Sequence, residues 1–131
     1  MIWAAQYVGR PFKDGGRGPD AYDCWGAVMA IYRDHLGIEL PHYGEISAAD
    51  LLRVRREIAA GAASEVWRKI EVPQEFDVCV MRLPSGRGHG HVGVMTDPRH
   101  VLHAEAGSGV SIERIDSATI RNRIMGFWRH V

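Results

Sequence analysis

A cysteine at the expected start of a helix is the first residue in this sequence that could carry nucleophilic chemistry. Cys24 follows Asp23, and aspartate commonly caps the N-terminus of a helix. A thiol in the first helical turn faces unpaired backbone N–H groups and the positive end of the helix macrodipole. We therefore expect a lowered pKa and an available thiolate near neutral pH. The alternative is that Cys24 is an unreactive cysteine buried in the helix.

A thiolate nucleophile also needs a base, and His91 is the better of two nearby candidates. His91 opens a β-rich segment, whereas His89 lies in the Gly-rich stretch before it. Side chains alternate between the two faces of a strand, so His91, Gly93 and Met95 should share one face. Because Gly93 has no side chain, we expect it to leave room beside His91.

A third polar group should hold the imidazole of His91 through its second ring nitrogen, and His103 is the candidate. The Asp97-Pro98 turn predicts a hairpin between the segments that carry the two histidines. Such a hairpin would place His103 opposite or diagonal to His91, with about 4.5 to 8 Å between their Cβ atoms. The alternative is that His103 is a half-exposed strand histidine.

A zinc site is the competing chemical interpretation of the same residues. His89 and His91 would share a strand face, His103 could supply a third nitrogen ligand, and Cys24 could be recruited from the helix. Because no acidic or thiol side chain lies beside these histidines at suitable spacing, we favour a thiol mechanism and expect neither metal nor cofactor.

The elements that must position these residues follow one another as helices first and strands second. The Gly- and Pro-rich residues 9–22 predict an ordered loop, and a helix should begin after Asp23 and end at Gly37. The apolar spacing in residues 47–61 predicts a second helix, with Pro73 separating this helical half from the strands. Strands are expected at residues 77–81, 91–96, 101–106, 110–115 and 125–130. The 131 residues therefore predict a single α+β domain over residues 1–131, with helices packed on an antiparallel sheet.

Charge and hydropathy exclude several classes of partner. The 16 Lys and Arg residues equal the 16 Asp and Glu residues, so we expect neither nucleic-acid binding nor attraction to an anionic membrane. No apolar run approaches the roughly 20 residues of a bilayer-spanning helix, and residues 1–7 lack the pattern of a signal peptide. We therefore expect no membrane insertion and synthesis in the cytoplasm. The second cysteine, Cys79, lies in an apolar run and is expected to be an inert core residue rather than half of a disulfide.

Five motifs in order make the sequence resemble the NlpC/P60 cell-wall cysteine peptidases along most of its length. These are Gly9-Arg10-Pro11-Phe12 with Gly15-Gly16, Asp23-Cys24-Trp25-Gly26, Leu40-Pro41, His91-Val92-Gly93-Val94 and Leu102-His103-Ala104. The resemblance implies a papain-like fold, with Cys24 as nucleophile, His91 as base and His103 as orienting group. It also implies hydrolysis of the peptide stems of peptidoglycan, often between D-glutamate and the diamino acid, through an acyl-enzyme.

Three departures from the family pattern narrow the resemblance. Phe12 stands where a tyrosine is common, Trp25 replaces a frequent serine, and Glu75-Phe76-Asp77 replaces the Gly-Asp that usually begins the first strand. The Asp-Cys-Trp-Gly form looks most like members encoded with phage tail genes. This implies tail proteins as further partners, and delivery to the wall by a phage particle or by lysis. Residues at or beside the motifs that we expect to contact substrate are Phe12, Asp23, Trp25 and Gly93.

Two other functions remain open at this stage. A phage tail assembly or wall-binding module could retain a peptidase fold without its activity, although three reactive side chains in order argue against it. A thiol amidase or acyltransferase acting on another substrate would use the same Cys24, His91 and His103.

Overall fold

A computed structural model describes residues 2–40, 67–83 and 90–130 of the chain. A short 3-10 helix, η1 (Ile2–Gln6), precedes the helix α1 (Cys24–Ile31), which continues as one π-helical turn, η2 (Tyr32–Leu36). Six strands follow. They are β1 (Trp67–Ile70), β2 (Val78–Arg82), β3 (Gly90–Asp97), β4 (His100–Glu105), β5 (Gly109–Arg114) and β6 (Ile124–His130).

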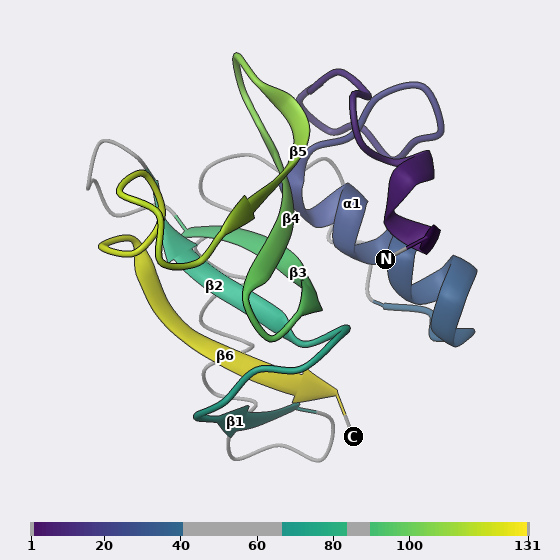
Figure 1. Cartoon of the computed structure of the whole chain (residues 1–131). Coiled ribbons are helices and arrows are strands. Elements are labelled where there is room, and N and C mark those ends of the chain that lie inside the picture. Colours follow the sequence, from purple (N-terminus) through teal and green to yellow (C-terminus); the bar gives the residue numbers. More distant parts are fainter. Residues whose placement is uncertain (1, 41–66, 84–89, 131) are drawn as a thin grey trace.

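The strands form one antiparallel sheet in the order β1-β6-β2-β3-β4-β5. Figure 1 shows that the sheet is strongly curved and that α1 lies against its β3–β4 side. The predicted α+β fold, with a helix packed on an antiparallel sheet, is thus confirmed. The five predicted strands are present to within one residue at either end.

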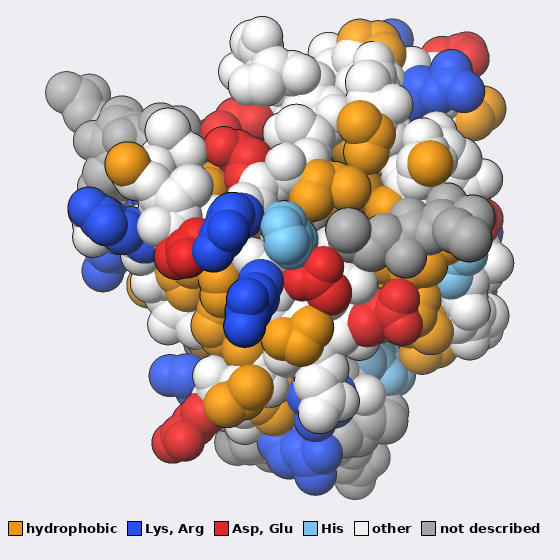
Figure 2. Space-filling model, in the orientation of Figure 1, with side chains coloured by type: hydrophobic (Ala, Val, Ile, Leu, Met, Phe, Trp, Pro, Cys, Tyr) orange, Lys and Arg blue, Asp and Glu red, His pale blue; other side chains and the backbone are white. Residues whose placement is uncertain are grey.

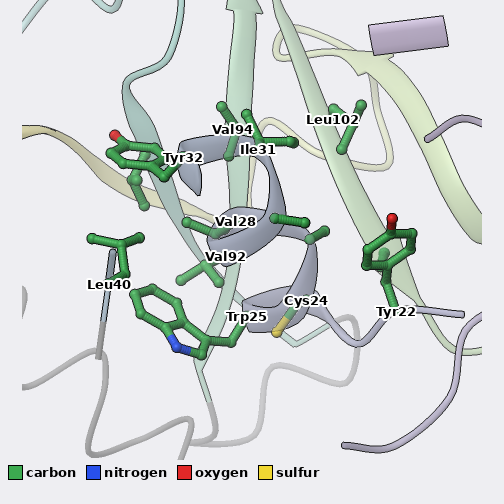
Figure 3. Packing of buried hydrophobic residues seen from close by; sticks show 14 of the residues in the cluster. Tyr22, Cys24, Trp25, Val28, Ile31, Tyr32, Leu40, Val92, Val94 and Leu102 are labelled. Carbon is green, nitrogen blue, oxygen red and sulfur yellow. The ribbon is translucent and has the colours of Figure 1, made fainter. Parts of the chain in front are cut away.

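α1 begins at the residue that the sequence indicated, and its π-helical continuation η2 ends at the predicted Gly37. Asp23 is its N-cap, accepting a hydrogen bond from the Gly26 N–H at 2.6 Å. Gly37 follows the π-helical turn with a φ of 66°, a left-handed conformation that glycine adopts without steric cost. Within Cys24–Ile31 the helix buries every residue except Met29, as expected for an element covered by a sheet. In Figure 3, Val28 and Ile31 of α1 pack on Val92 and Val94 of β3.

Two elements were not expected from the sequence. β1 precedes Pro73 in the sequence and pairs with β6. The prediction that Pro73 separates a helical half from the strands is therefore wrong. β1 is a short edge strand with a buried Trp67 and two exposed residues after it, a pattern too brief to be distinctive. η1 was also missed. The predicted second helix at residues 47–61 lies outside the described residues.

The sheet has a hydrophobic cluster on each face. The α1 face carries the larger cluster, which includes Val78, Val80, Val92, Val94 and Leu102. The opposite face carries a smaller cluster of strand residues with Ile120; these strand residues are Cys79, Met81, Met95 and Val101. The predicted alternation along β3 is therefore correct, because Val92 and Val94 face the helix while Met95 faces the other way.

Within the described residues, no helix is both long enough and apolar enough to cross a membrane. Figure 2 shows acidic and basic side chains interspersed over one face of the molecule.

Candidate active site

Cys24 occupies the first position of α1 and reaches the beginning of β3. Its thiol lies against the backbone of Val92, the residue after His91. In the described residues, β3 pairs with β2 from Gly90 to Val94 but with β4 only from Val94 onward. The start of α1 thus approaches β3 where its β4 side is unpaired. This arrangement brings the start of α1 close to the strand that carries His91, although the two are far apart in the sequence.

The predicted lowering of the Cys24 pKa is wrong for this structure. Only 3% of Cys24 is exposed, and burial together with the neighbouring Asp23 carboxylate raises the pKa of the thiol to about 12. Hydrogen bonding from the Val92, Trp25 and Cys24 backbones acts in the predicted direction but is outweighed. The physical reason is that exclusion of water penalises the thiolate more than the helix terminus stabilises it.

His91 and His103 form a direct hydrogen bond, which goes beyond the opposite or diagonal placement that the hairpin argument predicted. His91 Nε2 lies 2.8 Å from His103 Nδ1, and the exposed fractions of the two residues are 3% and 1%. Burial, His103 and the positive charge of Arg123 hold the pKa of His91 well below its usual 6.5. His91 is therefore a neutral imidazole at neutral pH, with Nδ1 as the nitrogen that His103 leaves unbound.

Among the described residues, no hydrogen bond joins the Cys24 thiol to the His91 ring. The structure therefore brings the two histidines into contact but places Cys24 only beside the backbone next to His91. The resting site contains a neutral thiol and a neutral base.

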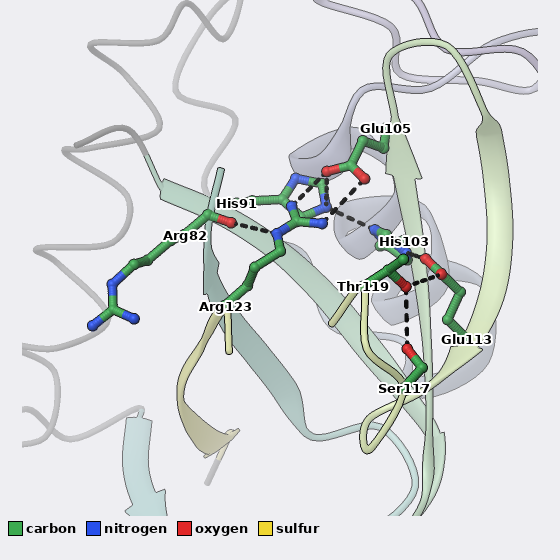
Figure 4. Close-up of polar contacts among 8 residues, drawn as sticks. All are labelled: Arg82, His91, His103, Glu105, Glu113, Ser117, Thr119 and Arg123. Atoms are coloured by element: carbon green, nitrogen blue, oxygen red, sulfur yellow. Dashed lines mark hydrogen bonds and ion pairs between the residues drawn. The ribbon is translucent and has the colours of Figure 1, made fainter. Parts of the chain in front are cut away.

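Three charged residues that the sequence analysis did not single out surround the histidine pair (Figure 4). Glu113 accepts a hydrogen bond of 2.6 Å from His103 Nε2. Glu105 Oε2 lies 3.7 Å from His91 Nε2 and 2.5 Å from Arg123 Nη2. Glu113 could have been found from the β4–β5 hairpin, because it is the diagonal neighbour of His103 on the same sheet face. Arg123 gave no comparable signal, since it reaches the site from the connection before β6.

In the structure, the possible zinc ligands differ from the set that the sequence suggested. His89 lies outside the described residues, but the ligand atoms of His91, His103 and Glu105 lie within 4.8 Å of one another. Two histidines and one glutamate are a known zinc ligand set. In the structure, however, the same residues take part in the His91–His103 hydrogen bond and the Glu105–Arg123 ion pair.

Two of the four residues expected to contact substrate are buried in structural roles. Asp23 caps α1 and binds Arg17 Nη1 at 2.9 Å through both carboxylate oxygens, with 2% of the residue exposed. Trp25, 1% exposed, belongs to the cluster beneath α1. These positions favour roles in shaping the site rather than in contacting substrate.

The other two residues expected to contact substrate, Gly93 and Phe12, lie in different surroundings. A Cβ atom at Gly93 would lie 2.7 Å from the Leu102 carbonyl oxygen and 3.0 Å from the Cβ of His103. The space that Gly93 provides therefore admits β4 and His103, rather than an open area beside His91. Phe12 is half-buried and lines an open groove of about 380 Å³ with residues 9–11 and 106–109.

Comparison with known proteins supports the same assignment of the fold. The model of the NlpC/P60 family matches residues 9–129. No curated protein matches the sequence. A lipoprotein-like NLP/P60 protein from Staphylococcus aureus has a TM-score of 0.69 at 23% identity, covering 100% of this chain and 40% of that chain.

Two further solved structures are similar. An NlpC/P60 family protein from Bacillus cereus has a TM-score of 0.67 at 19% identity, over 95% of this chain and 36% of that one. The NlpC/p60 domain of the peptidoglycan hydrolase SagA has a TM-score of 0.65 at 17% identity, over 99% and 94% of the two chains. This chain thus spans less than half of the two larger proteins and nearly all of the isolated domain. At these identities, the likeness shows the fold alone.

Proposed function

This chain belongs to the NlpC/P60 family, and we propose that it is a cysteine peptidase that hydrolyses the peptide stems of bacterial peptidoglycan. The family generally comprises cysteine peptidases and related hydrolases. The observation that supports the proposal most directly is the buried His91–His103 hydrogen bond beside the strand residue that touches Cys24. A neutral base held by a second histidine is what a thiol nucleophile requires.

The proposed reaction begins when substrate binding brings the Cys24 thiol within reach of His91 Nδ1. The sulfur attacks the carbonyl carbon of the peptide bond while its proton passes to Nδ1. The carbon–nitrogen bond then breaks, and His91 returns the proton to the leaving amine. Water next attacks the thioester with His91 as base, which releases the acid and restores the thiol.

The start of α1 supplies a place for negative charge during this reaction. The backbone groups of Cys24, Trp25 and Val92 hydrogen-bond toward the sulfur and lower the pKa of the thiol against the effect of burial. Such preorganised donors also stabilise the oxygen that becomes negative when a carbonyl carbon is attacked. The site therefore has donors in place although its resting thiol is protonated.

Two finer parts of the proposal are the scissile bond and an association with a phage. We propose the bond between D-glutamate and the diamino acid as the scissile bond, and an association with a phage tail or prophage. Membership of the family supports the scissile bond. The Asp23-Cys24-Trp25-Gly26 form of the nucleophile motif, which resembles that of tail-associated members of the family, supports the phage association. The SagA domain, a peptidoglycan hydrolase by name, supports the substrate class.

The burial of Cys24 favours a second candidate, a wall-binding or tail-assembly module that has kept the fold. Digestion of purified peptidoglycan, followed by mass spectrometry of the fragments, separates the two. A peptidase releases stem fragments with new amino and carboxyl ends, and Cys24→Ala releases none. Binding to the wall without fragments from the wild-type protein would instead establish the module.

The zinc alternative makes an opposite prediction about inhibitors. A thiol mechanism predicts that iodoacetamide inactivates the protein while a strong zinc chelator leaves hydrolysis unchanged. A loss of hydrolysis on chelation, restored by added zinc, would contradict the thiol mechanism. It would point to His91, His103 and Glu105 as metal ligands.

A further inference from the structure

We propose that Glu113 is a positioning residue that fixes the ring tautomers of His103 and, through it, of His91, so that His91 Nδ1 is left free to take the proton of Cys24. The part that concerns catalysis rests on the proposed function. The tautomer chain itself is a property of the folded protein and can be tested without any substrate.

The contact between Glu113 and His103 is short, with His103 buried and 33% of the Glu113 side chain exposed. Glu113 Oε2 accepts a hydrogen bond of 2.6 Å from Nε2 of His103, which is 1% exposed. The second oxygen of Glu113 accepts a hydrogen bond of 3.0 Å from the hydroxyl of Thr119. Figure 4 shows the carboxylate held between these two partners. Thr119 belongs to the connection between β5 and β6, so two separate segments fix the carboxylate.

Glu113 acts in this contact as an ionised acceptor. Burial alone would raise the pKa of the carboxyl, but the hydrogen bonds from His103 and Thr119 outweigh it and lower the pKa below its usual value. An ionised carboxylate can only accept hydrogen bonds. The proton between Glu113 and His103 must therefore be on His103 Nε2.

The position of that proton determines the next one. When each ring carries a single N–H, a proton on His103 Nε2 leaves His103 Nδ1 as an acceptor. The 2.8 Å hydrogen bond to His91 Nε2 then requires the proton of His91 to be on Nε2. His91 Nδ1 is left with a free lone pair, which is the state that a general base needs.

The other carboxylate near the histidines is less suited to this role. Glu105 Oε2 is 3.7 Å from His91 Nε2, beyond hydrogen-bond distance, and its carboxylate is paired with Arg123 at 2.5 Å. Arg123 also donates to the Arg82 carbonyl at 2.8 Å, which fixes its position. Glu105 therefore balances the charge of Arg123, whereas Glu113 is the carboxylate that contacts the imidazole pair.

The test is a measurement of histidine ring protonation by long-range ¹⁵N–¹H NMR on the full ¹⁵N-labelled chain at neutral pH. We expect both His91 and His103 to carry their proton on Nε2 in the wild-type protein. In Glu113→Ala, both rings should lose this single tautomer. Glu113→Gln should retain it, because the amide oxygen can still accept from His103. Glu71→Gln is the matched control, since Glu71 is exposed at the bend after β1.

Kinetics on peptidoglycan fragments provide the second measurement. We expect Glu113→Ala to lower kcat by about 10- to 100-fold with KM within about twofold, because a positioning group acts on the base and not on the substrate. Glu113→Gln should lose less, and Glu71→Gln should match the wild type.

Several results would overturn the proposal. A proton on Nδ1 of either ring in the wild-type protein would do so without any variant, even if Glu113→Ala fails to fold. Unchanged tautomers in a folded Glu113→Ala would do so as well. If the tautomers behave as expected but no peptidoglycan is cleaved, the proposed function fails while the role of Glu113 in the histidine pair stands.

Discussion

The polar side chains at the site form a continuous chain of satisfied contacts, with the nucleophile beside it. His91, His103 and Glu113 are linked by hydrogen bonds of 2.8 and 2.6 Å. Burial of such groups is costly unless each has a partner. Cys24, in contrast, is a small buried thiol that can remain neutral among apolar neighbours. These hydrogen bonds therefore hold His91 as a neutral base, whereas nothing comparable keeps Cys24 charged as a thiolate in the resting site.

The two cysteines form a matched pair for testing the nucleophile. Both are free and buried, with 3% of Cys24 and 0% of Cys79 exposed. We expect Cys24→Ala to abolish hydrolysis and Cys79→Ala to retain it. Each should lower the free energy of unfolding by about 1 to 2 kcal/mol, because each removes one buried sulfur. Peptidoglycan digestion and urea unfolding measure the two effects. A folded Cys79→Ala without activity would reverse the assignment.

The raised pKa of the thiol predicts how Cys24 reacts in the absence of substrate. Because the pKa is about 12, the thiolate fraction should rise about tenfold for each pH unit between roughly pH 6 and 9. The rate of alkylation by iodoacetamide should follow it without a plateau. The measurement is made on Cys79→Ala, so that only Cys24 can react. A plateau below about pH 8 would instead indicate a thiolate–imidazolium pair at rest.

At the scale of elements, the turn before β2 shows how this chain accommodates a departure from the family pattern. Phe76 stands where glycine usually precedes the aspartate, and it adopts a φ of 73°, in the left-handed region that favours glycine. Its ring stacks on Trp3 with centroids 4.9 Å apart, and its carbonyl accepts a hydrogen bond of 2.6 Å from the Tyr32 hydroxyl. Contacts with η1 and η2 thus stabilise a strained turn.

This strain predicts an unusual order of stability at position 76. Phe76→Ala loses the ring contacts and keeps the strain, whereas Phe76→Gly loses the same contacts and relieves about 1 to 2 kcal/mol of strain. Urea unfolding should therefore rank the wild type first, Phe76→Gly second and Phe76→Ala third. The control is Ala27→Gly within α1, where glycine should destabilise by about 1 kcal/mol. If Ala were more stable than Gly at position 76, the turn would not be strained.

At the scale of the whole molecule, the sheet separates the nucleophile helix from the segment that covers the histidines. α1 packs on one face, while residues 115–123 contribute Ile120, Thr119 and Arg123 to the other. His91 lies on this second face, since it pairs with Met81 in β2 and alternates with Met95 along β3. The start of α1 reaches the Val92 backbone, next to His91, along the part of β3 that comes before its pairing with β4.

The enclosure of His91 should make the stability of the whole protein depend on pH. The folded-state pKa of His91 is well below 6.5. Below pH 6.5, His91 is therefore protonated in the unfolded chain but remains neutral in the folded protein. Stability should therefore fall as the pH is lowered from 7 to 5. The slope contributed by this one group is at most about 1.4 kcal/mol for each pH unit.

Thermal or urea unfolding of the wild type and His91→Gln over this range measures the contribution of His91. The variant has no titrating ring at this position and should show a shallower fall, while the other histidines remain in both proteins. The carboxyls with lowered pKa values, Asp34, Asp97, Glu113 and Asp116, titrate below this range. Equal slopes in the two proteins would show that His91 binds its proton in the folded state.

The features that the sequence determined by itself are those governed by near neighbours in the chain. The Asp23 cap and the Gly37 terminus depend on backbone geometry within a few residues of each. The alternation along β3 and the hairpin that joins His91 to His103 depend on strand periodicity and one turn. These local rules were enough to predict the helix start, five of the six strands and a position for His103 opposite or diagonal to His91.

Only the tertiary structure decided the burial, the pKa values and the charged neighbours of the site residues. The pKa of Cys24 depends on how completely the packed sheet excludes water, and that effect exceeds the local effect of the helix terminus. Trp25 became a core residue for the same reason, because α1 is buried nearly all round. Glu113 and Arg123 act on the histidines from β5 and from the connection before β6. Their influence required folding, because electrostatic contacts depend on distance in space and not on separation along the chain.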